Sequence, residues 1–325
     1  MNRFIFTCGD INGVGPEIII KSLNKLCSFP DKRFIVIIPR NVFELTAEII
    51  KPEFNYKVSN KLNSIDDNQI VLFDIGKAKQ NLGHVTKEAG KYSYKAISAS
   101  CKILQKKYAD AVITAPISKT AINKFGIKFP GHTEIYSSWC GVRNYVMMFL
   151  SKEMNAALMT IHEPVKKIPH MITKKLLTNS LAVVKNALES DLGIRDAKLA
   201  VLGLNPHAGE SGLIGNEEIK TIKPVIDKMD YCEGPFSPDA FFANRLYKNF
   251  NCVVGMYHDQ VLIPFKMLNF TAGVNYTAGL PIVRTSPDHG TAFDIAGKGI
   301  ADESSIIEAF HYADLIVNNR KLTNG

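Results

Sequence analysis

The chain alternates short runs of β-branched and other apolar residues with longer segments that repeat apolar residues every three to four positions. The short runs are FIVIIP (34–39), IVLF (70–73), DAVIT (110–114), AALMTI (156–161), KLAVLGL (198–204) and CVVGMY (252–257). This alternation is typical of an α/β fold, and strands that are apolar on both faces indicate a mainly parallel, buried sheet. Segments 89–104 and 176–188 carry the helical spacing and predict helices that cover the sheet.

A chain of 325 residues, 46% of them hydrophobic, is long enough for roughly two domains of ordinary size. No apolar run reaches the roughly 18 residues that a membrane span needs, and the N-terminus runs straight into a glycine-rich turn. We therefore expect a cytoplasmic protein without a membrane partner. The six cysteines stand singly among apolar neighbours, which predicts reduced core residues rather than a cysteine metal site.

The net charge of +8 raises the question of a nucleic-acid partner, because clustered Lys and Arg side chains release counterions from phosphate backbones. The lysines occur at most in pairs, mostly in helical patterns where a solvated face explains them. We therefore expect no nucleic acid as a partner. A modest positive field suits a small anionic substrate equally well.

Three histidines each follow an apolar run: His162 follows AALMTI, His207 follows KLAVLGL, and His258 follows CVVGMY. A lone histidine is more often a hydrogen-bonded structural residue than a metal ligand, and these three are too far apart in sequence to form a local motif. Their shared position favours the metal interpretation, because open α/β sheets place ligands beyond the carboxyl ends of strands, where rigid elements converge.

A glycine cluster at residues 9–15 follows a short apolar strand and leads into a helix with Pro16 near its start. It is not a GxGxxG fingerprint, and Glu17 in the first helical turn would repel a bound phosphate. A tight structural turn and a cofactor contact both stay open for this cluster.

Two other segments place polar side chains in otherwise apolar sequence. His132 and Thr133 in GHTE offer an imidazole and a hydroxyl to an anionic or hydroxylated ligand, although Thr133 could instead cap a helix. Lys266, Asn275 and Arg284 could form a clamp for a phosphate or carboxylate, with exposed salt bridges as the alternative.

Together these segments resemble the 4-hydroxythreonine-4-phosphate dehydrogenase family of pyridoxal phosphate biosynthesis. The matching pieces occur in the family's order over nearly the whole chain: GDINGVGPEI, DAVITAPISK, PGHTEIY, LGLNPHAGESGLIGNEE, GPFSPDAFF, MYHDQVLIPFK and GVNYTAGLPIVRTSPDHGTAFDIAGKG. HGTAFDIAGKGIAD is also similar to the adenine-side loop of the isopropylmalate and isocitrate dehydrogenases, which bind dinucleotides without GxGxxG. Ile11 and Asn12 depart from the family's turn, which more often has Pro and a small residue there, so the shape of that turn stays open.

The resemblance implies two α/β/α domains flanking a cleft, as in the isocitrate and isopropylmalate dehydrogenases, with a non-Rossmann dinucleotide site. Residues 1–130 and 285–325 would form the cofactor-side domain, and residues 131–284 the metal, substrate and dimerisation domain. The implied assembly is a homodimer whose metal site lies near the subunit interface.

The resemblance also assigns residues. The metal ligands would be His162, His207 and His258; the substrate would contact His132, Thr133, Lys266, Asn275 and Arg284; and the cofactor loop would comprise His289, Gly290, Thr291, Ala292 and Asp294. The candidates for a general base are Asp239, which could instead cap a helix or orient a ligand, and Lys266 if burial near the metal lowers its pKa. The expected cofactors are NAD or NADP and one divalent ion (Zn, Mg, Mn or Co), and imidazole ligands favour ions softer than Mg²⁺.

The reaction implied is the oxidation of 4-phosphohydroxy-L-threonine, a small phosphorylated hydroxy amino acid, to 2-amino-3-oxo-4-phosphooxybutanoate, which decarboxylates to 3-amino-2-oxopropyl phosphate. Two alternatives stay open. One is a dehydrogenase of a four-carbon sugar-acid 4-phosphate, such as erythronate or threonate 4-phosphate. The other is a metal-bound module that binds phosphorylated metabolites without turnover.

Overall fold

The computed structural model describes residues 1–61, 69–128, 131–269 and 273–324. The chain divides into two compact units: unit 1 comprises Met1–Gly141 and Pro281–Val317, and unit 2 comprises Val142–Leu280 and Asn318–Gly325. The family resemblance implied domain boundaries after residues 130 and 284. The functional role of each part stays a prediction.

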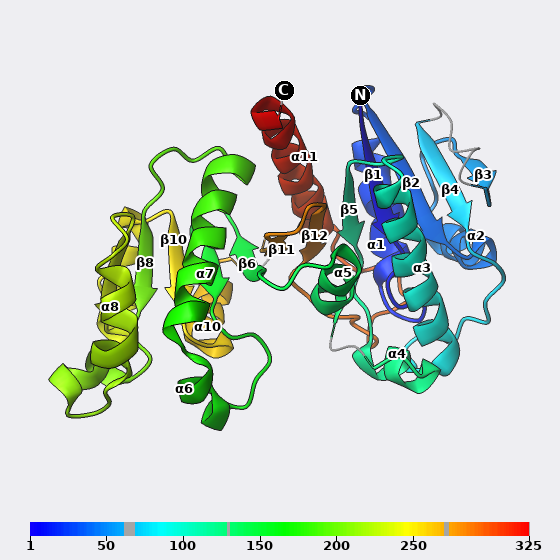
Figure 1. Ribbon diagram of the computed structural model, residues 1–325. Coiled ribbons are helices and arrows are strands. Elements are labelled where there is room, and N and C mark those ends of the chain that lie inside the picture. The colour runs from blue at the N-terminus through cyan, green and yellow to red at the C-terminus, as the bar shows by residue number, and fades with distance from the viewer. Residues whose placement is uncertain (62–68, 129–130, 270–272, 325) are drawn as a thin grey trace. The chain divides into compact units, whose positions relative to one another are not determined.

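Unit 1 contains a parallel sheet with the strand order β3-β4-β2-β1-β5-β12. Its strands are β1 (Asn2–Thr7), β2 (Lys32–Ile38), β3 (Lys57–Ser59), β4 (Ile70–Asp74), β5 (Ala111–Thr114) and β12 (Val283–Pro287). Its helices are α1 (Gly15–Leu26), α2 (Arg40–Ile49), α3 (Lys87–Gln105), α4 (Lys119–Phe125), α5 (His132–Cys140) and most of α11 (Ser304–Asn324) (Figure 1).

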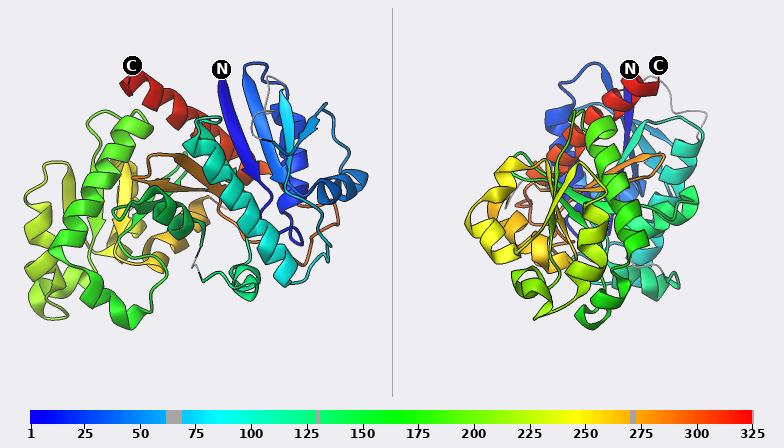
Figure 2. Two further views of the ribbon diagram at one scale, coloured as in Figure 1. Left: turned by 45° about the vertical axis from the view of Figure 1, so that its right-hand side comes forward. Right: turned by 60° about the vertical axis from the view of Figure 1, so that its left-hand side comes forward.

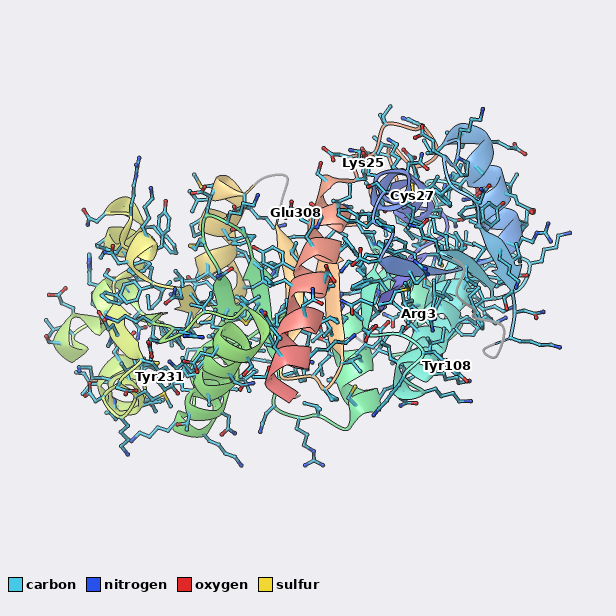
Figure 3. The ribbon with its side chains drawn as sticks, turned by 90° about the horizontal axis from the view of Figure 1, so that it is seen from above. Arg3, Lys25, Cys27, Tyr108, Tyr231 and Glu308 are labelled. Atoms are coloured by element: carbon cyan, nitrogen blue, oxygen red, sulfur yellow. The ribbon has the colours of Figure 1, made fainter. Side chains whose placement is uncertain are left out.

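The core of unit 1 forms where apolar strands meet helices. Helix α3 packs on β1 and β2, which stay side by side in every view (Figures 1 and 2). Phe4 of β1 is fully buried, and its ring meets that of Phe310 of α11 edge to face at 4.9 Å, a favourable aromatic geometry. At the edge of this core, the Arg3 guanidinium donates to the Tyr108 carbonyl at 3.0 Å (Figure 3).

Unit 2 contains a mixed sheet with the strand order β11-β6-β7-β10-β8-β9, in which β6 runs antiparallel to both neighbours and the other pairs are parallel. Its strands are β6 (Val146–Leu150), β7 (Ala156–Leu158), β8 (Leu199–Leu202), β9 (Cys232–Phe236), β10 (Cys252–Gly255) and β11 (Val274–Ala278). Its helices are α6 (Ile168–Met171), α7 (Lys174–Asn186), α8 (Lys223–Ile226), α9 (Pro238–Ala243) and α10 (His258–Leu268).

Packing and one buried ion pair hold unit 2 together. Helix α7 packs on β6, and α10 packs on β7 and β10. The Arg320 guanidinium donates to Asp191 at 2.6 Å, and the Tyr276 hydroxyl donates to the other oxygen of the same carboxylate. Because Asp191 is 3% exposed, its charge is tolerable only with these donors in place.

The predicted α/β class and mainly parallel sheet are confirmed. All six predicted runs form strands, although several end two or three residues earlier than the apolar sequence does. The predicted helices at 89–104 and 176–188 correspond to α3 and α7. In the part of the chain that the structure describes, no helix has both the length and the apolar character that crossing a bilayer requires.

Candidate active site

The three candidate metal ligands follow three neighbouring strands of unit 2. Strand β10 pairs in parallel with β7 on one side and with β8 on the other, so their carboxyl ends lie at one edge of the sheet. His162 follows β7, His258 follows β10, and His207 follows β8. The position predicted from the sequence, one histidine after each of three strand ends, is therefore present in the fold.

His162 and His258 are brought together by bonds between the ends of β7 and β10. The Met159 amide donates to the Gly255 carbonyl at 2.9 Å, and the Thr160 hydroxyl donates to the Met256 carbonyl at 2.7 Å. As a result the two imidazole rings lie 5.6 Å apart between centroids.

This spacing fits two ligands of one ion. Metal–nitrogen bonds of about 2.0–2.1 Å place each ring centroid about 3 Å from a bound ion, so two rings on one ion lie within about 6.5 Å. The fit is limited to this pair, because among the described residues no group of three His, Cys, Asp or Glu side chains is gathered closely enough to hold a metal. His207 as the third ligand stays a prediction.

His207 lies in a strained turn, η4 (Pro206–Gly212), which follows β8. Its φ is 51°, and φ is also positive at Ala208, Gly209, Glu210 and Ser211, so the backbone follows a left-handed path. At about 1–2 kcal/mol per non-glycine residue in this region, the four such residues cost roughly 4–8 kcal/mol. Such strain persists only where surrounding structure enforces it, and it is commonest at functional sites.

Asp239 lies beside the His207 turn in the first turn of α9. The residue that caps this helix is Ser237, so the expectation that Asp239 is the N-cap is wrong. The Ser237 hydroxyl donates to Asp239 at 2.6 Å, and this bond is the main cause of the lowered pKa of Asp239, with the positive potential of His207 as a smaller contribution. Asp239 is therefore ionised at neutral pH.

Lys266 and Asn275 belong to unit 2. Lys266 is exposed on α10, so the burial on which its role as a base depended is not found in this chain. Asn275 lies on β11 opposite Phe149 of β6 and is partly buried. Their assignment to the substrate stays a prediction.

The other three candidate substrate contacts, Arg284, His132 and Thr133, lie together in unit 1. Arg284 on β12 is 3% exposed, and its guanidinium donates twice to the Thr114 hydroxyl, at 2.8 and 3.2 Å, and once to Ser286 at 2.9 Å. It also donates to Thr133 at 3.4 Å. Burial lowers the pKa of Arg284 to about 10, which leaves it cationic at neutral pH.

His132 and Thr133 begin helix α5 next to this arginine. Gly131 occupies the N-cap position, so Thr133 is not the cap, and Pro130 lies outside the described residues. Among the described residues, the buried Nε2 atom of His132 has no hydrogen-bond partner. Burial, with the nearby charges of Arg284 and Lys119, lowers the pKa of His132 well below its usual value, so the ring is neutral and can donate or accept one bond.

Three residues of this cluster were missed by the sequence reasoning: Thr114, Ser286 and Lys119. Thr114 and Lys119 lie in the DAVITAPISK segment, and Ser286 follows Arg284 by two positions on the same strand face. Their place in segments that resemble the family was the sequence feature that could have identified them. Only the fold shows that β5 and β12, which are distant in sequence, bring the hydroxyls to one guanidinium.

The predicted cofactor loop packs against the glycine cluster of unit 1. The Val14 amide donates to the Thr291 carbonyl at 3.0 Å. A Cβ atom on Gly13 would lie 2.6 Å from that carbonyl oxygen, so only glycine allows this approach. His289, Gly290 and Asp294 are exposed, and Ala292 has a positive φ of 42°.

Glu17 has a structural role that the sequence reasoning did not foresee. Its buried carboxylate accepts from the Ala301 amide at 2.9 Å, and Lys21 on the next turn donates to the carbonyls of Gly299 and Ala301. Helix α1 therefore fixes the segment that follows the predicted cofactor loop.

Comparisons with known proteins find relatives that match nearly the whole chain. A 4-hydroxythreonine-4-phosphate dehydrogenase of Sulfurihydrogenibium sp. (strain YO3AOP1) is 40% identical over 99% of this chain and 100% of its own length. A protein of Oceanobacillus iheyensis with the provisional name D-threonate 4-phosphate dehydrogenase is 37% identical over 94% of this chain and 95% of its own length. The crystal structure of 4-hydroxythreonine-4-phosphate dehydrogenase from Klebsiella pneumoniae is 31% identical, with a TM-score of 0.84 over 97% of this chain and 98% of that one.

The family match covers most of the chain, from the second strand of unit 1 to helix α11. Residues 31–313 match the family described as pyridoxal phosphate biosynthetic protein PdxA. With the full-length dehydrogenase relatives, this match shows that the chain belongs to the PdxA family of pyridoxal phosphate biosynthetic proteins.

Proposed function

We propose that this enzyme oxidises 4-phosphohydroxy-L-threonine with NAD or NADP, giving 2-amino-3-oxo-4-phosphooxybutanoate, which loses carbon dioxide to form 3-amino-2-oxopropyl phosphate. The names of the full-length relatives support the reaction, and the Arg284 cluster supports an anionic substrate. One structural observation carries the proposal: the buried Arg284 cation is held by hydroxyl groups and lies next to the His132 Nε2 atom, which has no hydrogen-bond partner in the part of the chain that the structure describes.

In this proposal Arg284, Thr133 and His132 bind the anionic end of the substrate. A guanidinium can donate two parallel bonds to a phosphate or carboxylate, and Thr114 and Ser286 fix the plane in which it does so. The His132 Nε2 atom is the natural partner for an oxygen of the substrate, because it is buried and neutral. Lys119 adds positive potential nearby.

His162 and His258, with His207 as the predicted third ligand, would hold one divalent ion. When bound, the ion would supply Lewis acidity toward the C3 hydroxyl, and the nicotinamide ring would accept the hydride. The Nδ1 atom of His258 lies 2.7 Å from the Asp259 carboxylate, which fixes the orientation of the ring. Asp239, ionised beside His207, is better suited to orienting that imidazole than to accepting a proton, because a lowered pKa makes a carboxylate a weak base.

The proposal includes a homodimer with the metal site near its interface. Two groups of exposed apolar side chains in unit 2 support it. Leu213, Ile214 and Ile219 follow the His207 turn, and Leu213 is 85% exposed. Ile263 and Met267 are one turn apart on α10, which begins at His258. Large apolar side chains left in water next to candidate ligands are typical of a surface that a second subunit covers.

Metal content and turnover test this proposal together. Purified protein should reduce NAD or NADP in the presence of 4-phosphohydroxy-L-threonine, and exhaustive chelation should abolish the reduction until Zn²⁺ or Co²⁺ is restored. His207→Ala should lose both metal and turnover with an unchanged circular dichroism spectrum. Full activity in chelated protein or in the variant would refute the metal role, and substrate binding without NADH formation would favour a binding module.

A second substrate has its own support. The Oceanobacillus iheyensis relative, 37% identical over 94% of this chain, is named for D-threonate 4-phosphate, which presents the same phosphate and adjacent hydroxyl but no amino group. Comparison of kcat/KM for the two substrates separates the two candidate functions.

A further inference from the structure

The left-handed turn that carries His207 needs an external support. Six consecutive residues, from His207 to Gly212, have positive φ, and two of them, Gly209 and Gly212, are glycines. Around the turn, the Ala208 amide donates to the Asn205 carbonyl at 3.1 Å, the Leu213 amide to the Glu210 carbonyl at 3.1 Å and the Ile214 amide to the Gly209 carbonyl at 3.2 Å. Such short-range bonds also form in right-handed turns, so they do not select the left-handed path. Something outside the turn must therefore select this conformation.

The buried carboxylate of Glu218 is placed to do so. Its Oε1 atom accepts from the backbone amides of Leu204 and Asn205, both at 2.7 Å, where β8 passes into the turn. Its Oε2 atom accepts from the Asn205 side-chain amide at 2.9 Å. Glu218 is 2% exposed, so these three donors replace the water that an ionised carboxylate would otherwise bind.

The same carboxylate lies against the backbone of the turn. A Cβ atom on Gly209 would lie 2.6 Å from Glu218 Oε2, and one on Gly203 would lie 3.3 Å from Oε1. The carboxylate therefore lies against Gly203, in the segment that leads into the turn, and against Gly209 in the middle of the turn. Asn205 is fixed a second time, because its side-chain amide also donates to Glu217 at 2.8 Å.

The anchored end of β8 is also tied to the loop that carries His258. The Gln260 side chain donates to the Gly203 carbonyl at 2.6 Å, and its oxygen accepts from the Met256 amide at 2.7 Å. Gly203 precedes by one position the first amide that Glu218 holds, and Met256 precedes His258 by two. Glu218 and Gln260 thus link the backbone that precedes His207 to the backbone that precedes His258.

From this geometry we infer that Glu218 is a positioning residue for the metal site, which fixes His207 by holding the Leu204–Asn205 amides and the Asn205 side chain. The inference rests on the proposed function, because it takes His207 to be a metal ligand. Glu218 does not contact the metal or the substrate in this account. Glu218 stabilises the left-handed conformation of the turn over right-handed or extended conformations. Metal binding therefore does not have to supply the free energy that this conformation costs.

Titration of metal-free protein with Co²⁺ tests the inference without relying on turnover. Affinity is measured by calorimetry, and ligand geometry by the visible absorption of bound Co²⁺. Glu218→Ala removes all three acceptor contacts and should weaken Co²⁺ binding about 100-fold, the upper end of the range for residues that orient ligands. Glu218→Gln keeps one oxygen for the two backbone amides but turns a donor toward Asn205, so it should weaken binding only about 10-fold.

Two further variants make the outcomes distinguishable. Glu233→Gln removes the same charge from an exposed position on β9 and should bind Co²⁺ as the wild type does. If Glu218→Gln is folded and matches wild-type affinity and absorption while His207→Ala loses Co²⁺, the positioning role is overturned and the metal site stands. If His207→Ala itself binds Co²⁺ normally, the proposed ligand role of His207 fails, and the inference fails with it. Should Glu218→Ala not fold, Glu218→Gln carries the test.

Discussion

Replacement of Asp10 by asparagine should stabilise the protein, and should do so more at high pH than at low pH. Asp10 lies in the glycine cluster of unit 1 with no exposed surface. One carboxylate oxygen accepts from the Asn12 amide at 2.9 Å, and the other has no partner among the described residues. Burial raises the pKa of Asp10 from 3.8 to about 6.

The sign and size of the effect follow from this pKa. Because the folded state holds the Asp10 proton more tightly than the unfolded state does, ionisation of Asp10 opposes folding. The penalty begins near pH 4, grows up to about pH 6 and is constant above it. Fully developed, it amounts to about 3 kcal/mol at pH 8, and about 1 kcal/mol of it is present at pH 4.5. Asparagine keeps the acceptor for the Asn12 amide and has no charge to bury.

Urea unfolding at pH 4.5 and pH 8, followed by circular dichroism, measures this effect. The gain in unfolding free energy of Asp10→Asn over wild type should be larger by about 2 kcal/mol at pH 8 than at pH 4.5. Ser93→Ala is the matched control, because it removes the 2.8 Å bond from Ser93 to the Gly9 carbonyl without removing a titrating group. An equal gain at both pH values, or a loss at pH 8, would show that ionisation of Asp10 does not destabilise the folded state. A buried acid kept at this cost would favour a cofactor contact over a purely structural turn.

Three other perturbations have defined outcomes. Thr114→Val removes the hydroxyl that accepts two bonds from Arg284, so it should raise KM about tenfold with kcat little changed, and Thr114→Ser should restore KM; a loss of kcat alone would contradict a binding role. Arg284→Ala should likewise act mainly on KM in steady-state kinetics, and a pure loss of kcat would indicate a different role. Tyr276→Phe removes the hydroxyl shared by Asp191 and Arg320 and should lower the free energy of unfolding by about 1–3 kcal/mol in urea; an unchanged midpoint would show that the ion pair does not depend on it.

The strands and helices with strong periodicity were predictable from the sequence, while those with weak local signals were not. Runs such as FIVIIP and CVVGMY form β2 and β10, because β-branched residues that are apolar on both faces suit only a buried strand. Strand β9 has the sequence CEGPF, whose Gly and Pro argue against a strand, and its pairing with β8 overrides that local preference.

In the candidate site, too, features with a strong local sequence pattern were predictable and the others were not. One histidine after each of three strands could be predicted, because apolar runs mark the strand ends. The left-handed turn could not, since four of its six positive-φ residues are not glycine and the contacts with Glu218 come from about ten positions away in sequence. Nor could the hydroxyls around Arg284 be found, because Thr114 reaches it from a strand 170 residues away.

The ratio of kcat/KM for 4-phosphohydroxy-L-threonine to that for D-threonate 4-phosphate decides which of the two is the substrate of this enzyme. Initial rates of NADH or NADPH formation by the metal-loaded enzyme give this ratio in one assay. We expect oxidation of 4-phosphohydroxy-L-threonine to be favoured at least about tenfold, the discrimination that about 1.4 kcal/mol of transition-state binding provides. No reduced nicotinamide from 4-phosphohydroxy-L-threonine, or a ratio that favours D-threonate 4-phosphate, would contradict it.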